Sequence, residues 1–471
     1  MITINPPIKI RMVLIALIFS FSCSVNQNKI DAVDENVESE SVRPKISSFL
    51  LGQNYWMDLW EQRDVIFPLV RESGVKIIRI GGIGYDHDLS RRSNEEIETW
   101  IDDIKGAGAE PMLQVSRFAD VNDAVRWVKY FNVETKNRIQ YWNIGNEPNI
   151  HRPPGIEAVY DYVVKYARAM KEVDPTITIF VPDDAGYKRD GYVRLCGGDL
   201  DITGEKIGDT YLIDGFSWHL YAFWYDYARR HVMDRVQLTY RPIAQDLRKL
   251  MAAADAKHNR QGDQKLKWGI GEFNINVNID VDSDSVKYKT TEGVGHQSFL
   301  SGQFYAELFG MCMEEEAYYA ATWNIHEKGN RYTNDFGYLD GPMDNPTPRS
   351  NYWHMWMLAH NFSGEYCQGT SNQAWVKSFG CRDDKGYRVM LINMYNNRDF
   401  EFSLRLDDQS ASQDKALAIN INADSDTEHF DQIPNQTTVL LSFDNSGKLI
   451  KKISYDIQHA LDTKEPTVET F

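Results

Sequence analysis

The chain has 471 residues, which is enough for a barrel of about 250 residues and one smaller domain. Hydrophobic residues make up 42% of it and charged residues 25%, a globular composition that excludes a mostly disordered chain. The formal net charge of −17 is spread over both halves, and no basic stretch with interleaved aromatic residues occurs, so nucleic acid is not expected as a partner.

The first 23 residues have the layout of an export signal. Lys9 and Arg11 precede an apolar run over residues 12–21, which is too short to span a bilayer, and Cys23 follows. This layout resembles a bacterial lipoprotein signal, which implies cleavage before Cys23 and lipidation of its thiol. An ordinary secretory signal with an incidental cysteine is the alternative.

Residues 24–46 are polar and acidic, and we expect them to form a disordered tether behind the signal of residues 1–23. Together the two segments predict an exported lipoprotein anchored in the outer membrane, at the cell surface or in the periplasm. The cysteines after Cys23 have no metal-binding spacing. They are Cys196, Cys312, Cys367 and Cys381. A disulfide between Cys367 and Cys381 and isolated buried thiols are both open.

Eight short apolar runs alternate with helical patterns over residues 47–361. The runs cover residues 49–56, 75–80, 111–115, 139–144, 177–181, 213–220, 266–271 and 318–324. Helices are predicted between them over residues 60–72, 93–107, 122–131, 156–173, 234–258 and 293–313.

Eight parallel strands are the number at which such a sheet closes and loses its exposed edges, so the α/β pattern predicts a (β/α)8 TIM barrel. An open doubly wound sheet is the alternative. It usually carries a glycine fingerprint at the first helix, and Gly52-Gln53-Asn54 is not one.

The pattern changes after residues 341–348, which are rich in turn-forming residues, and after a last helix predicted over residues 351–360. Strands are expected at residues 375–381, 387–394, 400–406, 417–422, 437–443 and 449–455. We therefore predict a C-terminal antiparallel β-sandwich domain over residues 362–457 and a flexible tail over residues 458–471.

Two glutamates end apolar runs where a parallel barrel carries its active site. Glu147 follows the fourth run in Asn146-Glu147-Pro148, and Glu272 follows the seventh. Either one alone could cap a helix or pair with an arginine. Together they would face each other across the barrel mouth, which is the arrangement that glycosidic bond cleavage needs: one group protonates the leaving oxygen and the other attacks or activates water.

This order of motifs resembles glycoside hydrolase clan A, the retaining TIM-barrel glycosidases. The resemblance covers about residues 48–361, and the C-terminal β-domain is similar to that of families 39, 51, 30 and 79. It implies that Glu147 is the acid/base, that Glu272 is the nucleophile and that Asn146 binds the substrate 2-hydroxyl.

The resemblance implies roles for further residues. Arg79 would hold the nucleophile ionised, Tyr221 would hydrogen-bond to it, and Trp323 would stack against the sugar. His219 lies two residues before Tyr221, so both point the same way. Each has a structural alternative, which is ion pairing in the barrel mouth for Arg79 and core packing for the others.

Other residues are expected to line the substrate site because they end or follow the apolar runs. They are Asn54, Trp56, Gln114 and Trp224, with Tyr55, Ser116 and Asp183 beside them. Arg229, Arg230 and Arg235 follow the sixth run, where they would meet a sulfate or carboxylate of a glycan, or form a solvated helix face.

The predicted function is a monomeric retaining glycoside hydrolase acting on a polysaccharide or oligosaccharide, with uronic or sulfated glycans as open substrates. No metal or other cofactor is expected, because no group of histidines or acidic residues has ligand spacing. A glycan-binding lipoprotein on a decayed barrel is the alternative function, and metal-dependent hydrolysis is a weaker one.

Overall fold

The structure, a computed structural model, describes most of the chain from Arg43 onward. The described residues are 43–56, 62–88, 92–135, 137–150, 155–224, 226–277, 290–327, 336–342, 344–408, 411–413 and 415–471. The predicted signal with Cys23, and the tether up to residue 42, lie outside them. None of the described helices has the length and apolar character needed to cross a membrane.

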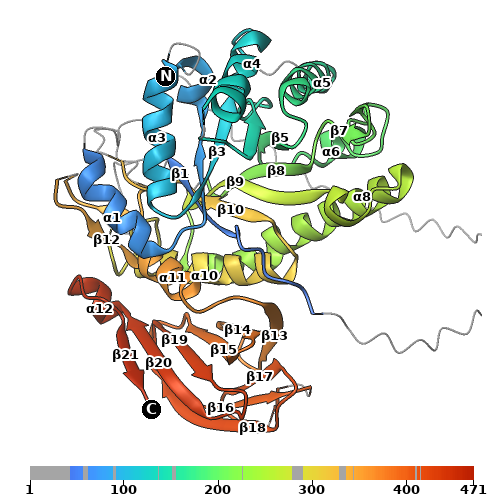
Figure 1. Ribbon diagram of the computed structural model, residues 1–471. Coiled ribbons are helices and arrows are strands. Elements are labelled where there is room, and N and C mark those ends of the chain that lie inside the picture. The colour runs from blue at the N-terminus through green and yellow to red at the C-terminus, as the bar shows by residue number, and fades with distance from the viewer. Residues whose placement is uncertain are drawn as a thin grey trace, which may run out of the picture. The chain divides into compact units, whose positions relative to one another are not determined.

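Eight parallel strands close into a barrel (Figure 1). They are β1 (Leu51–Tyr55), β2 (Ile77–Ile80), β3 (Glu110–Val115), β4 (Tyr141–Ile144), β5 (Thr178–Ala185), β8 (Gly215–Phe223), β9 (Lys267–Asn276) and β10 (Tyr319–Thr322). Strand β1 pairs with both β2 and β10, which closes the sheet. Each predicted run overlaps one of these strands, so the barrel is confirmed and the open sheet is wrong.

The long helices also lie where the sequence predicts them. They are α1 (Arg63–Ser73), α3 (Asn94–Gly106), α4 (Val121–Lys129), α5 (Ile156–Val173), α8 (Arg241–His258), α10 (Phe299–Glu314) and α11 (Ser350–Ala359). Shorter elements were missed because five to seven residues carry too little periodicity. They include α2 (Ile83–Asp88), α6 (Arg189–Leu195) and α7 (Arg229–Arg235), whereas the π-helical turn η4 (Val236–Tyr240) lies inside the helix predicted over residues 234–258.

The C-terminal domain is a curled sheet. Its strands are β13 (Glu365–Ser371), β14 (Val376–Asp383), β15 (Gly386–Asn393), β16 (Phe400–Asp407), β17 (Ala418–Asn422), β18 (Thr427–Ile433), β19 (Thr437–Phe443), β20 (Leu449–Asp456) and β21 (Thr467–Thr470). It encloses its own core, with Val389, Leu404 and Leu441 fully buried. The predicted β-sandwich is confirmed, except that β16 and β17 run parallel and not antiparallel.

Two predicted boundaries need correction. Residues 458–471, predicted as a flexible tail, form part of α12 (Ile457–Leu461) and all of β21, which pairs with β20. Residues 43–46, assigned to the tether, lie against the C-terminal sheet: Arg43 forms a 2.9 Å ion pair with Asp424, and the Ile46 amide donates to the Gly364 carbonyl. Both segments are held by backbone pairing, which the composition of a sequence does not reveal.

The four cysteines after Cys23 are buried and free. Cys367 on β13 lies opposite Gly380 on β14, while Cys381 lies opposite Tyr366. The disulfide is not formed, and the alternative of isolated thiols is the one that the structure adopts.

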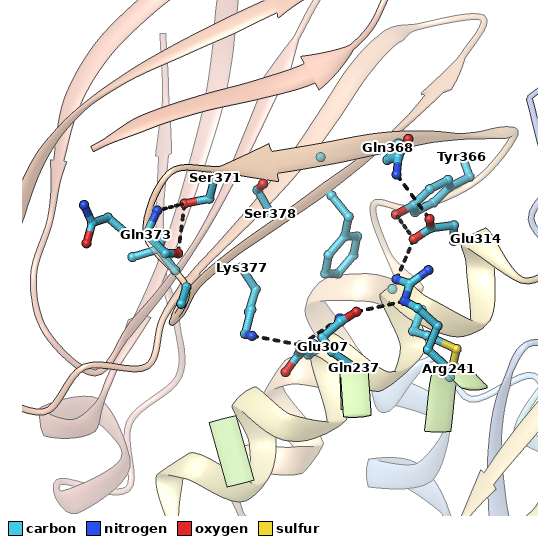
Figure 2. Close-up of a pocket in the computed structure, with 16 residues that line it drawn as sticks. Gln237, Arg241, Glu307, Glu314, Tyr366, Gln368, Ser371, Gln373, Lys377 and Ser378 are labelled. Atoms are coloured by element: carbon cyan, nitrogen blue, oxygen red, sulfur yellow. Dashed lines mark hydrogen bonds and ion pairs between the residues drawn. The ribbon is translucent and has the colours of Figure 1, made fainter. Parts of the chain in front are cut away.

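Helix α10 lies between the barrel and the C-terminal sheet (Figure 1), and its residues from Phe299 to Met313 are buried. A helix that is apolar all round needs cover on every side, which the barrel and the sheet supply together. We call the polar part of this contact the junction (Figure 2). There Glu307 of α10 meets Lys377 of β14 at 3.3 Å, and Glu314 accepts a 3.0 Å hydrogen bond from Tyr366 of β13.

Candidate active site

A buried arginine organises the mouth of the barrel. Arg79 on β2 is 1% exposed, and its guanidinium group contacts side chains from β1, β3, β4, β5 and β9 or the residues after them. Its partners at 2.8–3.2 Å are the amide oxygens of Asn54, Gln114, Asn143 and Asn146 and the carboxylates of Asp183 and Glu272. A planar guanidinium with several donors can hold this many acceptors in fixed directions.

The structure brings the two predicted glutamates together. Glu147 follows β4, Glu272 lies in β9, and ligand atoms of Glu147, His219 and Glu272 lie within 4.8 Å of one another. Retaining glycosidases separate their carboxyl groups by about 5–5.5 Å and inverting ones by about 6.5–9.5 Å. The spacing therefore fits direct attack by one carboxylate and leaves little room for a water molecule between them.

Glu272 has two donors. Arg79 Nη1 lies 2.9 Å from its Oε1, and the Tyr221 hydroxyl donates to its Oε2 at 3.2 Å. Burial raises the pKa of Glu272, and the charges of His219 and Arg79 oppose that rise. Donors directed at both oxygens favour the ionised form of the carboxyl group, which is the form that a nucleophile needs.

His219 on β8 lies between Glu147 and Asp183 of β5. Its Nδ1 atom lies 3.1 Å from Glu147 Oε1, and its Nε2 atom lies 3.6 Å from Asp183 Oδ1. Burial alone would lower the pKa of His219, but the negative charges of Glu272 and Asp183 raise it to about 10. The ring is therefore an imidazolium at neutral pH, with a proton on each nitrogen.

The charges of this cluster balance when one glutamate is neutral. Arg79 and His219 carry two positive charges, and Asp183 and Glu272 carry two negative ones. Burial would raise the pKa of Asp183, but Arg79 and His219 together lower it, so Asp183 stays ionised. Two carboxylates as close as Glu147 and Glu272 favour one proton between them, which is the state that acid catalysis requires.

The backbone also holds Glu147 in place. Its amide donates to the Asp183 carbonyl at 3.0 Å, and its φ angle of 43° lies in the left-handed region, which non-glycine residues seldom adopt. Such strain persists only where surrounding contacts enforce it, and it is concentrated at functional positions.

Glu147, His219 and Glu272 also form the one group of candidate metal ligands found among the described residues. A protonated imidazole donates hydrogen bonds and does not coordinate a cation. Arg79 beside Glu272 adds a positive charge where the ion would sit. The three residues therefore fit proton transfer better than metal binding.

The cluster opens into a cleft of about 600 Å³. Predicted residues in its lining are Trp56, Asn146, Glu147, His219, Tyr221, Trp224, Glu272 and Trp323. Trp224 is 54% exposed, whereas Trp323 is 9% exposed and meets Trp56 edge to face with ring centroids 5.4 Å apart. Gly82 has a φ of 117°, and a Cβ atom there would come within 2.9 Å of the Trp323 ring, so this close approach requires glycine.

Other predicted lining residues lie beneath the cleft and do not line it. Asn54 and Gln114 are fully buried and accept hydrogen bonds from Arg79. Gln114 also accepts from the Gly82 amide at 2.7 Å. The prediction that these two touch substrate is corrected: they position Arg79 and the Gly82 turn. Arg79 is likewise absent from the lining and acts on the carboxylates from below.

The arginines after β8 do not face the cleft. Arg229 donates to Gln436 at 2.8 Å, and Arg235 lies over the Phe223 ring at 4.9 Å. Lys188 is the sole lysine or arginine among the described residues of the lining. The expected cationic contact with an anionic glycan therefore has no arginine from this group.

Sequence reasoning missed Asp86 on α2. Its Oδ2 accepts from the Asn146 amide at 3.0 Å and its Oδ1 from Gln114 at 2.9 Å, so it holds the loop before Glu147. Burial raises the pKa of Asp86 to about 6, against the charge of Arg117. No pattern marks it, because α2 has six residues, which are too few to show a helical period.

No protein-family model matches the sequence, and no curated protein matches it. Solved structures do match. An α-L-arabinofuranosidase from Thermotoga maritima aligns over 84% of this chain and 96% of its own, with 13% identity and a TM-score of 0.62. A family 51 α-L-arabinofuranosidase from Bifidobacterium longum aligns over 91% and 93%, with 12% identity and a TM-score of 0.62.

A xyloglucanase of glycoside hydrolase family 44 from Paenibacillus polymyxa aligns over 85% of this chain and 97% of its own, with 12% identity and a TM-score of 0.55. These alignments include the C-terminal sheet as well as the barrel. The chain therefore shares the fold of these glycosidases, a closed barrel with a C-terminal sheet domain, as the sequence resemblance predicts.

Proposed function

We propose that this protein is a retaining glycoside hydrolase that cleaves poly- or oligosaccharides by double displacement. The observation that carries the proposal is the pair of carboxyl groups of Glu147 and Glu272 within 4.8 Å of each other at the cleft. The likeness of the fold to glycosidases supports it.

In the first step, an Oε atom of Glu272 attacks the anomeric carbon while Glu147 gives its proton to the leaving oxygen. The glycosidic C–O bond breaks, a glycosyl ester forms on Glu272, and Glu147 becomes a carboxylate. In the second step, Glu147 takes a proton from water, whose oxygen attacks the anomeric carbon and releases Glu272.

Neighbouring residues bind the sugar. Asn146 Oδ1 accepts from Arg79 at 2.8 Å, so the NH2 group of this amide is available to donate to a hydroxyl, such as the 2-hydroxyl. Trp323 and Trp56 offer aromatic surface beside the carboxylates, and the more exposed Trp224 offers it further out.

For the substrate we propose a glycan of pentoses or hexoses. The matched structures include arabinofuranosidases and a xyloglucanase. A uronic or sulfated glycan has weaker support, because Arg229 and Arg235 are engaged elsewhere.

The test is hydrolysis of a polysaccharide panel that contains arabinan, xylan, xyloglucan, a glucuronoxylan and a sulfated galactan, with the first product observed by NMR. We expect reducing ends from at least one glycan and retention of its anomeric configuration. Inversion would exclude double displacement. Glycan binding without release of reducing ends would favour the non-catalytic binding protein.

Export and lipid attachment at Cys23 are part of the proposal and rest on residues 1–23 of the sequence. We expect the protein to fractionate with membranes as a monomer and Cys23→Ser to release it. An unchanged distribution of the variant would exclude the lipid anchor.

A further inference from the structure

The proposed reaction moves one negative charge across the cluster, from Glu272 to Glu147, when the glycosyl ester forms. His219 lies between the two groups. Its Nδ1 atom is 3.1 Å from Glu147 Oε1 and 3.7 Å from Glu272 Oε2. The same N–H group is thus at hydrogen-bond distance from Glu147 and at ion-pair distance from Glu272, so a small movement of the ring would let it donate to either.

A donor can serve both only if its ring is held from the other side and keeps its proton. Asp183 meets both needs. Its Oδ1 faces His219 Nε2 at 3.6 Å, and its Oδ2 is fixed by Arg79 at 3.1 Å. Asp183 is 1% exposed, so its charge acts on the imidazole without screening by bulk water.

The backbone of Asp183 ties this arrangement to the acid/base. Its carbonyl accepts from the Glu147 amide at 3.0 Å, and its φ angle of 57° is left-handed. The same residue therefore positions Glu147 through its main chain and His219 through its side chain. Its side chain does not line the cleft.

We propose that Asp183 is a positioning residue that holds His219 as a cationic donor shared by both glutamates, so that Nδ1–H stabilises whichever of them is ionised. The inference rests on the proposed double displacement. In the resting enzyme the negative charge is on Glu272. In the glycosyl ester it is on Glu147, and Arg79, His219, Asp183 and the remaining carboxylate sum to zero in both states.

Other charged groups face His219 as well. They are Asp183 and Asp184 on β5, Glu147 after β4, Glu272 on β9 and, beyond Asp184, Lys188. Burial raises the pKa of Asp184 to about 7, so near neutral pH it contributes less negative charge than Asp183. Asp184→Asn is therefore a matched control for Asp183→Asn.

The first experiment titrates the protein with ¹⁵N-labelled histidine and follows His219, assigned by His219→Gln. We expect a wild-type imidazolium at pH 8, and Asp183→Asn to move the titration at least one pH unit toward acid. Asp184→Asn should move it less. A neutral His219 at pH 7 in the wild type would overturn the inference, even if the protein is a glycosidase.

The second experiment measures kcat/KM between pH 5 and 9 on an activated aryl glycoside. A fall of one unit from a His219 pKa of about 10 leaves about half of the rings neutral at pH 9, so Asp183→Asn should lose about twofold more activity at pH 9 than at pH 6, and more for a larger fall. In a His219→Gln background it should cause no further pH-dependent loss. An equal loss at every pH, with unchanged ¹⁵N shifts, would assign Asp183 a merely structural role.

The histidine titration and the activity measurement test different proposals, so one can fail without the other. If no glycoside is hydrolysed, the proposed function fails while the histidine titration still reads the charge of the ring. Urea unfolding of each variant shows whether a loss of activity reflects a loss of fold, and His219→Gln provides the second variant if Asp183→Asn does not fold.

Discussion

Two regions of the molecule bury carboxylates but compensate their charge differently. One is the junction, and the other is the floor of the cleft, by which we mean Arg79, Asp183, His219 and Glu272. At the floor, Arg79 and His219 face Asp183 and Glu272, so each charged group has more than one partner. At the junction, Lys377 is the one cation within ion-pair distance of Glu307 among the described residues, and the charge of Arg241 acts on Glu307 from further away.

Both regions have unused acceptor capacity, because neither carboxylate oxygen of Asp183 has a hydrogen-bond partner among the described residues. Glu307 Oε1 accepts from Gln237 at 3.0 Å, while its buried Oε2 has no hydrogen-bond partner among the described residues. Burial raises the pKa of Glu307, against the charge of Lys377. We infer that the junction tolerates a neutral carboxyl group, whereas the floor is built to keep its charges.

The largest effect that separates the two regions is on catalysis. Glu272→Gln removes the proposed nucleophile, and kcat on an aryl glycoside should fall by about 10⁴-fold or more. Glu428→Gln, which breaks an exposed ion pair with Lys415, is the control and should leave kcat unchanged. A fall of less than tenfold for Glu272→Gln would exclude its role.

Arg79→Met tests the floor as a charge network. It leaves Asp183 and Glu272 buried without their main cation, so we expect the free energy of unfolding, measured with urea, to fall by about 3–5 kcal/mol. A fall below about 1 kcal/mol would show that the floor is no more charge-dependent than a surface.

From the positive charge of His219 we predict how the free energy of unfolding depends on pH. The pKa of His219 is raised to about 10, so its stabilisation is fully present below about pH 6.5 and is lost as pH rises through 10. Over this window the folded state binds up to one more proton than the unfolded state, so its free energy of unfolding falls by up to about 1.4 kcal/mol per pH unit.

Comparison with His219→Asn isolates this contribution. Urea unfolding of both proteins from pH 6 to 10 should give a steeper decline for the wild type. Parallel curves would mean that His219 is neutral in the folded protein.

The smallest effect is expected at the junction. Lys377→Met removes the cation beside Glu307, and proton uptake by Glu307 limits the cost to about 1 kcal/mol of unfolding free energy at pH 6. If the loss equals that of Arg79→Met in the same urea measurement, the contrast between the two regions is wrong.

The sequence predicted the parts of the fold that repeat. Buried parallel strands are apolar along their whole length, and helices of ten or more residues repeat their pattern, so all eight barrel strands were found. Strand β18 was missed because it alternates exposed and half-buried residues, and β21 because all four of its residues are exposed. Both are held by pairing with another strand, β18 with β16 and β21 with β20.

The candidate site was predictable where chemistry and strand order coincide. Glu147 and Glu272 follow apolar runs, and their meeting follows from barrel closure. The sequence did not predict how deep each side chain lies. Asn54 and Gln114 also lie at the ends of apolar runs, but the structure buries them one layer below the cleft. Asp86 could not be found at all, because its role depends on a six-residue helix that carries no pattern.

The short strand β21 has a practical consequence for anyone trimming this chain. It pairs with β20 over 451–454, at the end of the nine-stranded sheet. Removing the polar residues after Thr463 would uncover the N–H and C=O groups of β20, and an uncovered strand is a template for another chain. The segment that looks most dispensable by composition thus covers the eight-residue strand β20 with a four-residue edge strand, which is a smaller template for edge-to-edge pairing.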